Sequence, residues 1–456
     1  MRTFRLVAPF MALLLVLAAC APGDDNGGAA SPGDNGNGNG DNGGTAECPE
    51  APSDAGGGIV VTSLWGGAEE EAFRAVLEAF TEETGIEATY EANRTDYATV
   101  LRTRIQGGNP PDVAIIPGIG FLRSFARDNS IVPLECYGID VADIEGEYVP
   151  GMLNAGNVDG TQYGLMAKVN SKATIWYDPE RFGEFGVEPA DTWDGLVSLS
   201  DEIRNAGGTP WSLAAADGWT LTDWFEATYL KMHGPDAYDT LFSAEGDWTD
   251  GTAQETIEKM YGELLTAENV EGGTDGALAT AFVDGIAKVF STSPSAEMYC
   301  CGAFVGGIAA SGDVNPELEG QFGTRYDWFP FPTIEGGAGE IGDISYGGDV
   351  IAGLTNREEV GEFLRFMATV EAGTTWAEGG TIISPLAGVD TSVYPESVQP
   401  EAEQIANASS AHFDGSDLLP AGPDLGAVLQ SAFRGDDVGA LLEEFQAQVS
   451  NAWETE

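Results

Sequence analysis

The fold is decided by residues 59–85, which read IVVTSLWGGAEEEAFRAVLEAFTEETG. The opening IVVTSLW is an apolar, β-branched run of strand length that halts at two glycines. The segment 73–80 then places its apolar residues at i, i+3, i+4 and i+7, which gives a helix one apolar face. Gly85 stands where a C-cap would end that helix. The stretch therefore predicts a strand, a glycine turn and an amphipathic helix.

The same alternation continues toward the C-terminus. Residues 86–92 predict a second strand, 97–105 a second helix, and 113–116 a third, fully buried strand. Strands and helices that alternate with short links are typical of a parallel sheet covered by helices, and ligands bind beyond the carboxyl ends of such strands. The residues that follow the three strands are therefore candidate ligand contacts: Trp65, Gly66, Gly67, Arg94, Asp96 and Pro117. Arg94 with Asp96 also fits a surface ion pair, and Trp65 also fits a residue that packs the strand end.

The rest of the chain predicts a second sheet and a helical C-terminal part. Residues 131–134 suggest a step into a strand, and 160–168 and 173–177 suggest strands that feed the second sheet, with a first crossing between lobes near Lys168. Residues 328–332 end that sheet, 346–354 return to the first lobe, and a second crossing follows near Glu371. Residues 281–290 are expected to hold a small helix followed by a core strand. Further helices are expected at 179–185, 195–205, 223–233, 257–265, 359–370, 373–378, 400–408, 425–433 and 438–453.

Several motifs resemble a known family. WGG (65–67), FTEETGI (80–86) and GGNPPDV (107–113) resemble the N-terminal lobe of family 1 extracellular solute-binding proteins, the sugar receptors of ABC importers that are related to maltose-binding protein. Further motifs resemble, more narrowly, the α-glucoside-binding branch: TWD (192–194), GWTLTDW (218–224), GGD (347–349) and ISP (383–385). The similarity runs from about Ile59 to Trp453.

The resemblance implies a fold and a division of the chain. The implied fold is α/β, a type II periplasmic-binding architecture with two lobes, a hinge of several crossings and a ligand cleft between the lobes. The expected parts are a lipoprotein signal peptide (1–20), a disordered acidic Gly/Asn/Asp tether (21–58), an N-terminal lobe (59–167 plus 333–371) and a C-terminal lobe (168–332 plus 372–456). The expected ligand is a neutral oligosaccharide, and the expected partner is an ABC permease that receives it. The protein itself is expected to be a monomer.

Sugars have flat apolar faces and a rim of hydroxyls, so a site for them needs aromatic platforms and fixed polar groups. Trp219 lies between Gly218 and a predicted helix start, and Gly348 lets a ligand approach the backbone beside Asp349. Lys168 at the crossing fits either a hinge residue or a ligand contact. The resemblance adds three roles: Asp349 binds a glucosyl hydroxyl pair, Tyr299 matches an aromatic that stacks on sugar, and Asp414 belongs to HFDGSD (412–417), a motif of the α-glucoside branch. The segment PSA (294–296) departs from the family pattern near Tyr299.

The start of the chain predicts export and lipidation. Arg2 and Arg5 precede an apolar run, 6–19, that ends in LAAC (17–20). This box resembles a bacterial lipobox, so Cys20 is expected to become the lipid-modified N-terminus, held outside the cytoplasm at the cell membrane. An uncleaved membrane anchor is the alternative, but the run is shorter than the roughly 20 residues that span a bilayer.

The chain is strongly acidic, with 74 Asp plus Glu against 19 Lys plus Arg and a net charge of −55. This charge argues against nucleic acid and anionic ligands as partners. Because the acidic residues are spread along the chain, a solvated surface suited to high salt explains them better than cation sites do.

Four of the five cysteines follow Cys20 and are expected outside the membrane, where disulfides persist. Four thiols allow three pairings. Cys48–Cys136 is the preferred bridge, while Cys300 and Cys301 could bond to each other or remain buried thiols. The two histidines are far apart and have no cysteine at ligand spacing, so no metal or other cofactor is expected.

Two other classes of function fit less well. A secreted glycoside hydrolase needs a pair of carboxyl groups, but a chain this acidic offers many such pairs by composition alone. No Gly-x-Ser-x-Gly elbow and no phosphate-binding loop occurs in the sequence. An inert surface scaffold leaves the glycine-rimmed strand ends and the aromatic loops unexplained. The sequence therefore favours a binding protein that is not an enzyme.

Overall fold

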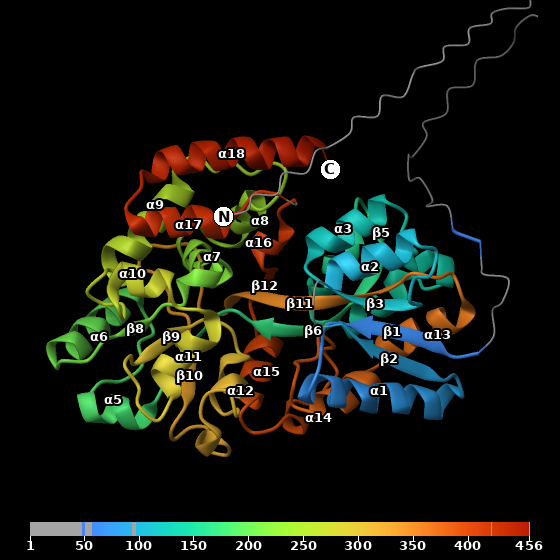
Figure 1. Cartoon of the computed structure of the whole chain (residues 1–456), viewed down its shortest axis with the longest axis horizontal. Coiled ribbons are helices and arrows are strands. Elements are labelled where there is room, and N and C mark those ends of the chain that lie inside the picture. The colour runs from blue at the N-terminus through green and yellow to red at the C-terminus, as the bar shows by residue number, and fades with distance from the viewer. Residues whose placement is uncertain (1–47, 51–56, 94–96, 421, 456) are drawn as a thin grey trace, which may run out of the picture. The chain divides into compact units, whose positions relative to one another are not determined.

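The structure is a computed structural model that describes residues 48–50, 57–93, 97–420 and 422–455. Cys20, most of the predicted tether, Arg94 and Asp96 lie outside the described residues. The described part contains two large sheets with helices around each, joined through the strands β6 and β11 (Figure 1). A third, two-stranded sheet pairs β4 (Asn157–Val158) with β5 (Thr161–Gln162). The predicted architecture of two α/β lobes is therefore confirmed.

The first sheet has six strands in the order β12-β11-β3-β1-β2, with β6 paired to β11. Its strands are β1 (Ile59–Ser63), β2 (Ala88–Ala92), β3 (Val113–Pro117), β6 (Gly164–Ser171), β11 (Asp343–Gly353) and β12 (Ser410–Phe413). Strands β1, β2 and β3 are parallel, as the alternation of strands and helices predicts. Their helices are α1 (Ala68–Thr84), α2 (Tyr97–Gln106) and α3 (Ile119–Arg127).

Helix α1 forms as its sequence predicts. Phe73, Val76 and Phe80 are fully buried beneath it, and Gly85 adopts the left-handed conformation of a C-cap with φ 75°. The helix packs against α14 (Val370–Glu378), and α13 (Glu358–Met367) packs on β11. Because α14 lies on α1, the predicted lobe boundary near residue 371 falls at a helix that contacts the first lobe. The boundaries of the lobes stay a prediction.

The second sheet has four strands in the order β10-β7-β9-β8. They are β7 (Thr174–Tyr177), β8 (Trp211–Ser212), β9 (Met298–Cys300) and β10 (Asp327–Pro330). The surrounding helices are α5 (Pro179–Phe185), α6 (Trp193–Asn205), α7 (Trp219–His233), α8 (Pro235–Leu241), α9 (Thr252–Lys259), α10 (Gly273–Leu278), α11 (Phe282–Phe290) and α12 (Val305–Ala309). Thr192 caps α6 by accepting the backbone N–H of Gly195, the cap expected from the TWD motif. The C-terminal helices are α15 (Gln399–Ala406), α16 (Gly415–Leu418), α17 (Leu425–Arg434) and α18 (Val438–Thr455).

The sequence-based predictions of strands at 131–134 and 160–168 are wrong. Residues 131–134 form no strand, because Val132 makes a single backbone hydrogen bond to Gly353 and the chain then enters the 3-10 turn η1 (Leu134–Tyr137). The strand predicted at 160–168 is placed in the wrong sheet: β6 pairs antiparallel with β11 of the first sheet. We call the antiparallel pair β6 and β11 the ribbon.

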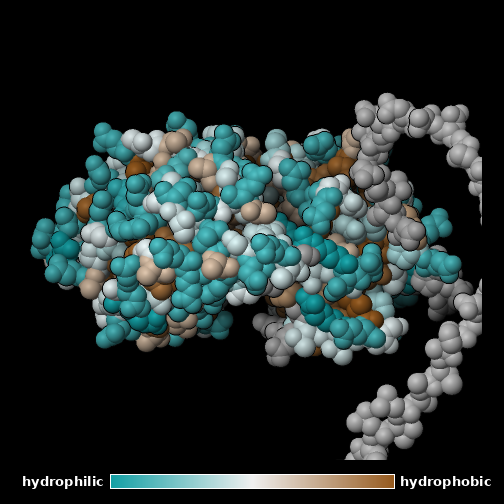
Figure 2. All heavy atoms as spheres, turned by 90° about the horizontal axis from the view of Figure 1, so that it is seen from above, coloured by the Kyte–Doolittle hydropathy of each residue, from teal (hydrophilic) through white to brown (hydrophobic). Residues whose placement is uncertain are grey.

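The cysteines after Cys20 are all bonded. Cys48 is joined to Cys136 of η1 with Cα atoms 5.5 Å apart, the pairing preferred from the sequence, and Cys300 is joined to Cys301. The first bridge fixes the start of the described chain to the first lobe. Hydrophilic residues cover most of the face seen in Figure 2 without gathering in one patch, which suits the spread of acidic residues along the sequence.

Candidate binding cleft

A first group of candidate residues meets where β1 and β3 end against the ribbon. In the strand register, Asp349 of β11 lies opposite Pro117 of β3 and opposite Lys168 of β6. Trp65 follows β1 by two residues, and its Nε1 donates a hydrogen bond to Asp349 Oδ2 over 3.0 Å. The structure thus brings together four residues that the sequence singles out from separate segments: Trp65, Pro117, Lys168 and Asp349.

Lys168 is buried but well compensated. Its Nζ lies 2.6 Å from Glu69 Oε1 and 3.5 Å from Asp349 Oδ2, and 4.7 Å from the centroid of the Trp65 ring. Burial alone lowers the pKa of Lys168, but the carboxylates of Asp349 and Glu69 outweigh burial and raise it. The lysine is therefore charged at neutral pH. We call Trp65, Glu69, Lys168 and Asp349 the ribbon cluster.

A second charged group surrounds Lys172, which follows β6. The Lys172 Nζ lies 2.9 Å from Asp223 Oδ1 on α7 and 3.4 Å from Asp414 Oδ2. Burial alone lowers the pKa of Lys172, and the carboxylates of Asp223 and Asp414 raise it above its ordinary value. Trp219 lies over the same ammonium group, with its ring centroid 5.1 Å from Nζ.

Helix α16 adds Asp417 to this region, and Glu226 of α7 contacts the start of that helix. Asp414 caps the helix and accepts the backbone N–H of Asp417 and the hydroxyl of Ser416. Glu226 of α7 accepts the backbone N–H groups of Gly415 and Ser416 at 2.8 and 3.0 Å. We call Lys172, Asp223, Glu226, Asp414 and Asp417 the Lys172 cluster.

An aromatic cavity of about 760 Å³ opens beside both clusters. Gly66, Glu69 and Lys168 form one side of it, and Trp219 is its most exposed aromatic residue, with 36% of its surface accessible. The aromatic wall comes from the second lobe: Trp176, Trp219, Phe282, Phe304 and Tyr326. Segment 380–383, Ser397, Val398 and Glu401 close the far side. Flat apolar surface and charged groups thus face the same volume.

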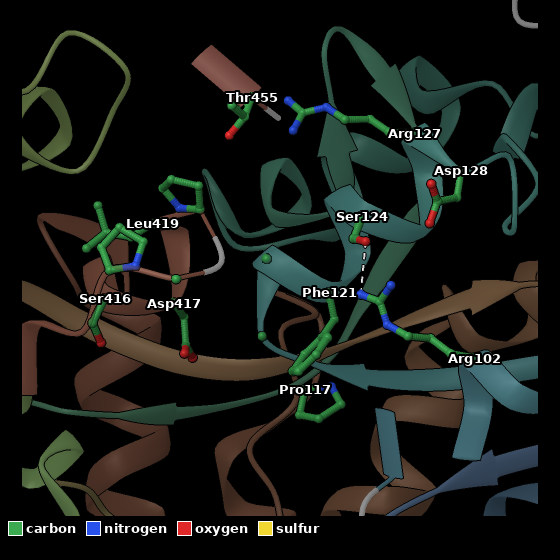
Figure 3. A pocket seen from close by; sticks show the side chains of 15 residues that line it. Arg102, Pro117, Phe121, Ser124, Arg127, Asp128, Ser416, Asp417, Leu419 and Thr455 are labelled. Carbon is green, nitrogen blue, oxygen red and sulfur yellow. Dashed lines mark hydrogen bonds between the residues drawn. The ribbon is translucent and has the colours of Figure 1, made fainter. Parts of the chain in front are cut away.

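A second cavity, of about 660 Å³, lies between α3 and α16 (Figure 3). Pro117 and Phe121 lie below it in the view, Ser416 and Asp417 of α16 face it from the left, and Arg127 and Asp128 come from the end of α3. Asp417 therefore belongs to both the Lys172 cluster and the wall of the second cavity.

The Lys172 cluster contains four carboxyl groups and one lysine, and the pKa values of three of the carboxyl groups are raised. Burial raises the pKa of Asp223 to about 7 despite Lys172, and burial also raises that of Glu226. Asp417 is exposed and lines the second cavity, and desolvation together with Asp414 raises its pKa to about 8. No group of three His, Cys, Asp or Glu side chains arranged to hold a metal ion occurs among the described residues.

These shifts predict how stability depends on pH. A carboxyl group whose pKa is higher in the folded than in the unfolded chain binds more protons when folded, so its contribution is complete near pH 4 and is lost as pH rises through about 7 to 8. We expect the melting temperature to be at least about 2 °C higher at pH 5.5 than at pH 8.5 in scanning calorimetry. Asp223→Asn should reduce this difference, and an equal slope in both proteins would contradict the assignment.

The remaining predicted contacts lie in different surroundings. Gly66 lines the aromatic cavity, Gly67 is exposed before α1, and Gly348 packs its backbone against Lys168 within the ribbon. Asp414 is buried against Lys172. Tyr299 is only 1% exposed on β9, lines neither cavity and packs in the core of the second lobe.

Sequence reasoning did not select several residues of the cleft: Glu69, Lys172, Glu226, Phe304, Tyr326 and Glu401. One of them carried a signal, because Lys172 stands four residues after Lys168 and even spacing places both on one face of a strand. Phe304 and Tyr326 had none, since only the folding of their loops turns them toward Trp219 and the cavity.

Known proteins match this chain over most of its length. Residues 66–374 match the family model of bacterial extracellular solute-binding proteins. The osmoprotective compounds-binding protein GgtB of Synechocystis sp. is 30% identical over 368 residues, which cover 79% of this chain and 84% of that protein. The alpha-glucosides-binding periplasmic protein AglE of Rhizobium meliloti is 27% identical over 412 residues, 87% of each chain.

Solved structures show the same architecture. A cyclic alpha-maltosyl-1,6-maltose binding protein from Arthrobacter globiformis has a TM-score of 0.66 at 18% identity, and the match covers 87% of this chain and 99% of that one. The fold is therefore that of the type II periplasmic sugar-binding proteins, with the cleft between its lobes.

The chain belongs to the bacterial extracellular solute-binding protein family. The resemblance seen in the sequence is thereby confirmed for the family and for the class of receptor that serves sugar ABC importers. Within the described ranges, no helix is both long and apolar enough to cross a membrane.

Proposed function

We propose that this protein captures a neutral α-glucoside oligosaccharide and delivers it to an ABC permease without changing it chemically. The observation that carries the proposal is the exposed Trp219 ring beside the two charged clusters. A pyranose ring that stacks on Trp219 lies in the cavity that Glu69 and Lys168 also line, so its hydroxyl rim can meet their polar groups, with Asp349 next to Lys168. The cavities also have the size expected for a small ligand, within roughly 300–1,000 Å³.

The charge of the cleft supports a neutral ligand. The two clusters contain two lysines, and each lysine already contacts two carboxylates. Carboxylates without a surplus of cations repel anionic ligands such as sugar phosphates. They accept hydrogen bonds from sugar hydroxyls in fixed directions. The names of the relatives AglE and GgtB are consistent with an α-glucoside or another osmoprotective compound as ligand.

Calorimetric titration of the purified protein with maltose, trehalose, sucrose, isomaltose and glucose tests the proposal. We expect micromolar binding of at least one α-glucoside, with lactose as a β-linked control that binds more weakly. Chromatography of the sugar after overnight incubation should show no hydrolysis. Release of glucose would favour the glycoside hydrolase instead, and silence across all sugars would reject the proposed ligand class.

We also propose that lipid on Cys20 holds the receptor outside the cytoplasm at the cell membrane. The support is the LAAC box after a basic and apolar N-terminus. Cys20→Ala should move the protein from the membrane fraction to the medium or periplasm, measured by immunoblotting of separated fractions. Membrane association equal to that of the native chain would contradict lipidation at Cys20.

A further inference from the structure

Glu401 is a buried carboxyl group on the wall of the aromatic cavity. It lies in the first turn of α15, is only 6% exposed and lines the cavity together with Trp219 and Phe304. One of its oxygens, Oε1, accepts the backbone N–H of Ser171 over 2.9 Å. That bond fixes the side chain at the junction of α15 and β6, so the carboxyl group is held in place before any ligand arrives.

The charged groups around Glu401 are committed elsewhere. Helix α15 packs on β6, whose Lys168 faces Glu69 and Asp349, and Lys172 beyond its end faces Asp223 and Asp414. Tyr394, which precedes α15, accepts the N–H of Ser384 through its hydroxyl. Across the cavity the titratable groups are Glu69, Lys168, Asp313 and Tyr326, and on its own helix Glu403 is exposed. In the part of the chain that the structure describes, no lysine or arginine forms an ion pair with Glu401.

A buried carboxylate without a cation is costly, so such a group takes up a proton instead. Burial raises the pKa of Glu401 to about 8, against the opposing effect of the Ser171 N–H. At neutral pH the group is therefore a carboxylic acid, which has one O–H donor in addition to its acceptor oxygens. A neutral donor suits an ether or hydroxyl oxygen of a sugar, whereas a lone carboxylate would suit an ammonium group.

We infer that Glu401, in its protonated form, is a specificity-determining residue that donates a hydrogen bond to an oxygen of the bound sugar in the aromatic cavity. This inference rests on the proposed function and extends it. It predicts that the bound sugar has an acceptor oxygen at the α15 end of the cavity. It also makes capture of the sugar depend on pH, because an ionised Glu401 has no proton to donate.

Titration calorimetry at pH 7 and pH 9 with maltose, trehalose and sucrose tests the inference. With half-ionisation near pH 8, the native affinity for the sugar that binds should fall about ten-fold from pH 7 to pH 9. Glu401→Ala should weaken binding by about ten-fold or more at pH 7. Glu401→Gln, whose amide N–H replaces the donor, should restore affinity to within about three-fold and flatten the dependence on pH.

Two controls isolate the effect of Glu401. Glu403→Gln removes an exposed carboxyl group of the same helix and should keep the native pH profile. Because Asp223 and Asp417 titrate in the same range, the diagnostic quantity is the difference between the slopes of the native protein and of Glu401→Gln. A measurement without ligand adds a second test: Glu401→Gln should raise the melting temperature more at pH 9 than at pH 6, because the contribution of the buried native carboxyl group is lost progressively as pH rises from about 4 through about 8.

The outcomes separate this inference from the proposed function. If a panel sugar binds but Glu401→Gln is as weak as Glu401→Ala, or if both slopes are equal, the donor role is overturned while the receptor function stands. Binding of D-glucosamine, lost in Glu401→Gln, would show a carboxylate that holds a cation and would also overturn the inference. If no sugar of the panel binds at either pH, the proposed ligand class and this inference fail together.

Discussion

Lys172→Met should lower the free energy of unfolding by about 3 kcal/mol at pH 8, because it removes the lysine that Asp223 and Asp414 contact inside the protein. Breaking a buried charge pair costs far more than breaking a surface pair, since the remaining charges have no solvent to stabilise them. Urea titration followed by tryptophan fluorescence measures the change. The loss should be smaller at pH 5, where Asp223 takes up a proton and no longer needs the lysine.

Arg74→Met is the matched control for this experiment. It removes a cation of similar length from an exposed pair with Glu70 on α1, where less than about 1 kcal/mol is at stake. If the two substitutions cost the same at pH 8, the Lys172 cluster does not stabilise the fold in the way proposed. A loss at pH 5 as large as at pH 8 would show that packing, rather than charge, explains the effect.

Trp219→Ala and Asp349→Ala should each weaken binding of the captured sugar by about ten-fold or more, or about 1.4 kcal/mol per ten-fold change. Trp219 supplies the most exposed aromatic face of the cavity, and Asp349 supplies a carboxylate beside it on the ribbon. Titration calorimetry at pH 7 measures both changes. Val283→Ala, which shortens an exposed apolar side chain on α11 that lines neither cavity, should bind as the native protein does.

Each substitution tests a different part of the site. Unchanged affinity in Trp219→Ala alone would move the stacking surface to another aromatic residue, such as Phe304. Unchanged affinity in both variants would remove the cleft assignment, while the fold and the family would stand. Melting curves of both variants show whether a loss of affinity reflects the site or a loss of folded protein.

The first lobe could be predicted from the sequence because its signals are local. Phe73, Val76 and Phe80 mark the buried face of α1 by spacing alone, and Gly85 marks its end. Strand β12 could not be predicted, because its four residues, SAHF, become a strand only by pairing with β11. The sheet that holds β6 was mistaken for the same reason: its partner is more than 170 residues further along the chain.

The residues of the candidate site also fall into those that local sequence signals indicate and those that only tertiary packing reveals. Trp65 follows a predicted strand and Lys168 lies at a predicted crossing, so position in the chain was enough to select them. Asp349 was selected because it follows two glycines and by resemblance. Tyr299 was selected by resemblance, and burial on β9 places it away from both cavities. Glu401 was not selected, because a glutamate in a helix usually faces solvent and only tertiary packing buries this one.

The ribbon connects two proposed ligand contacts to the link between the two sheets. Lys168 and Asp349, which we propose as ligand contacts, lie on β6 and β11, and β6 passes through Lys172 into β7 of the second lobe. We expect substitutions there to alter both which sugar is held and how readily the lobes close on it. The walls of the cavities, at Phe304, Tyr326 and Phe121, lie off these strands. Redesign of sugar preference is therefore best directed at the walls, whereas a reporter dye that senses closure belongs on the ribbon.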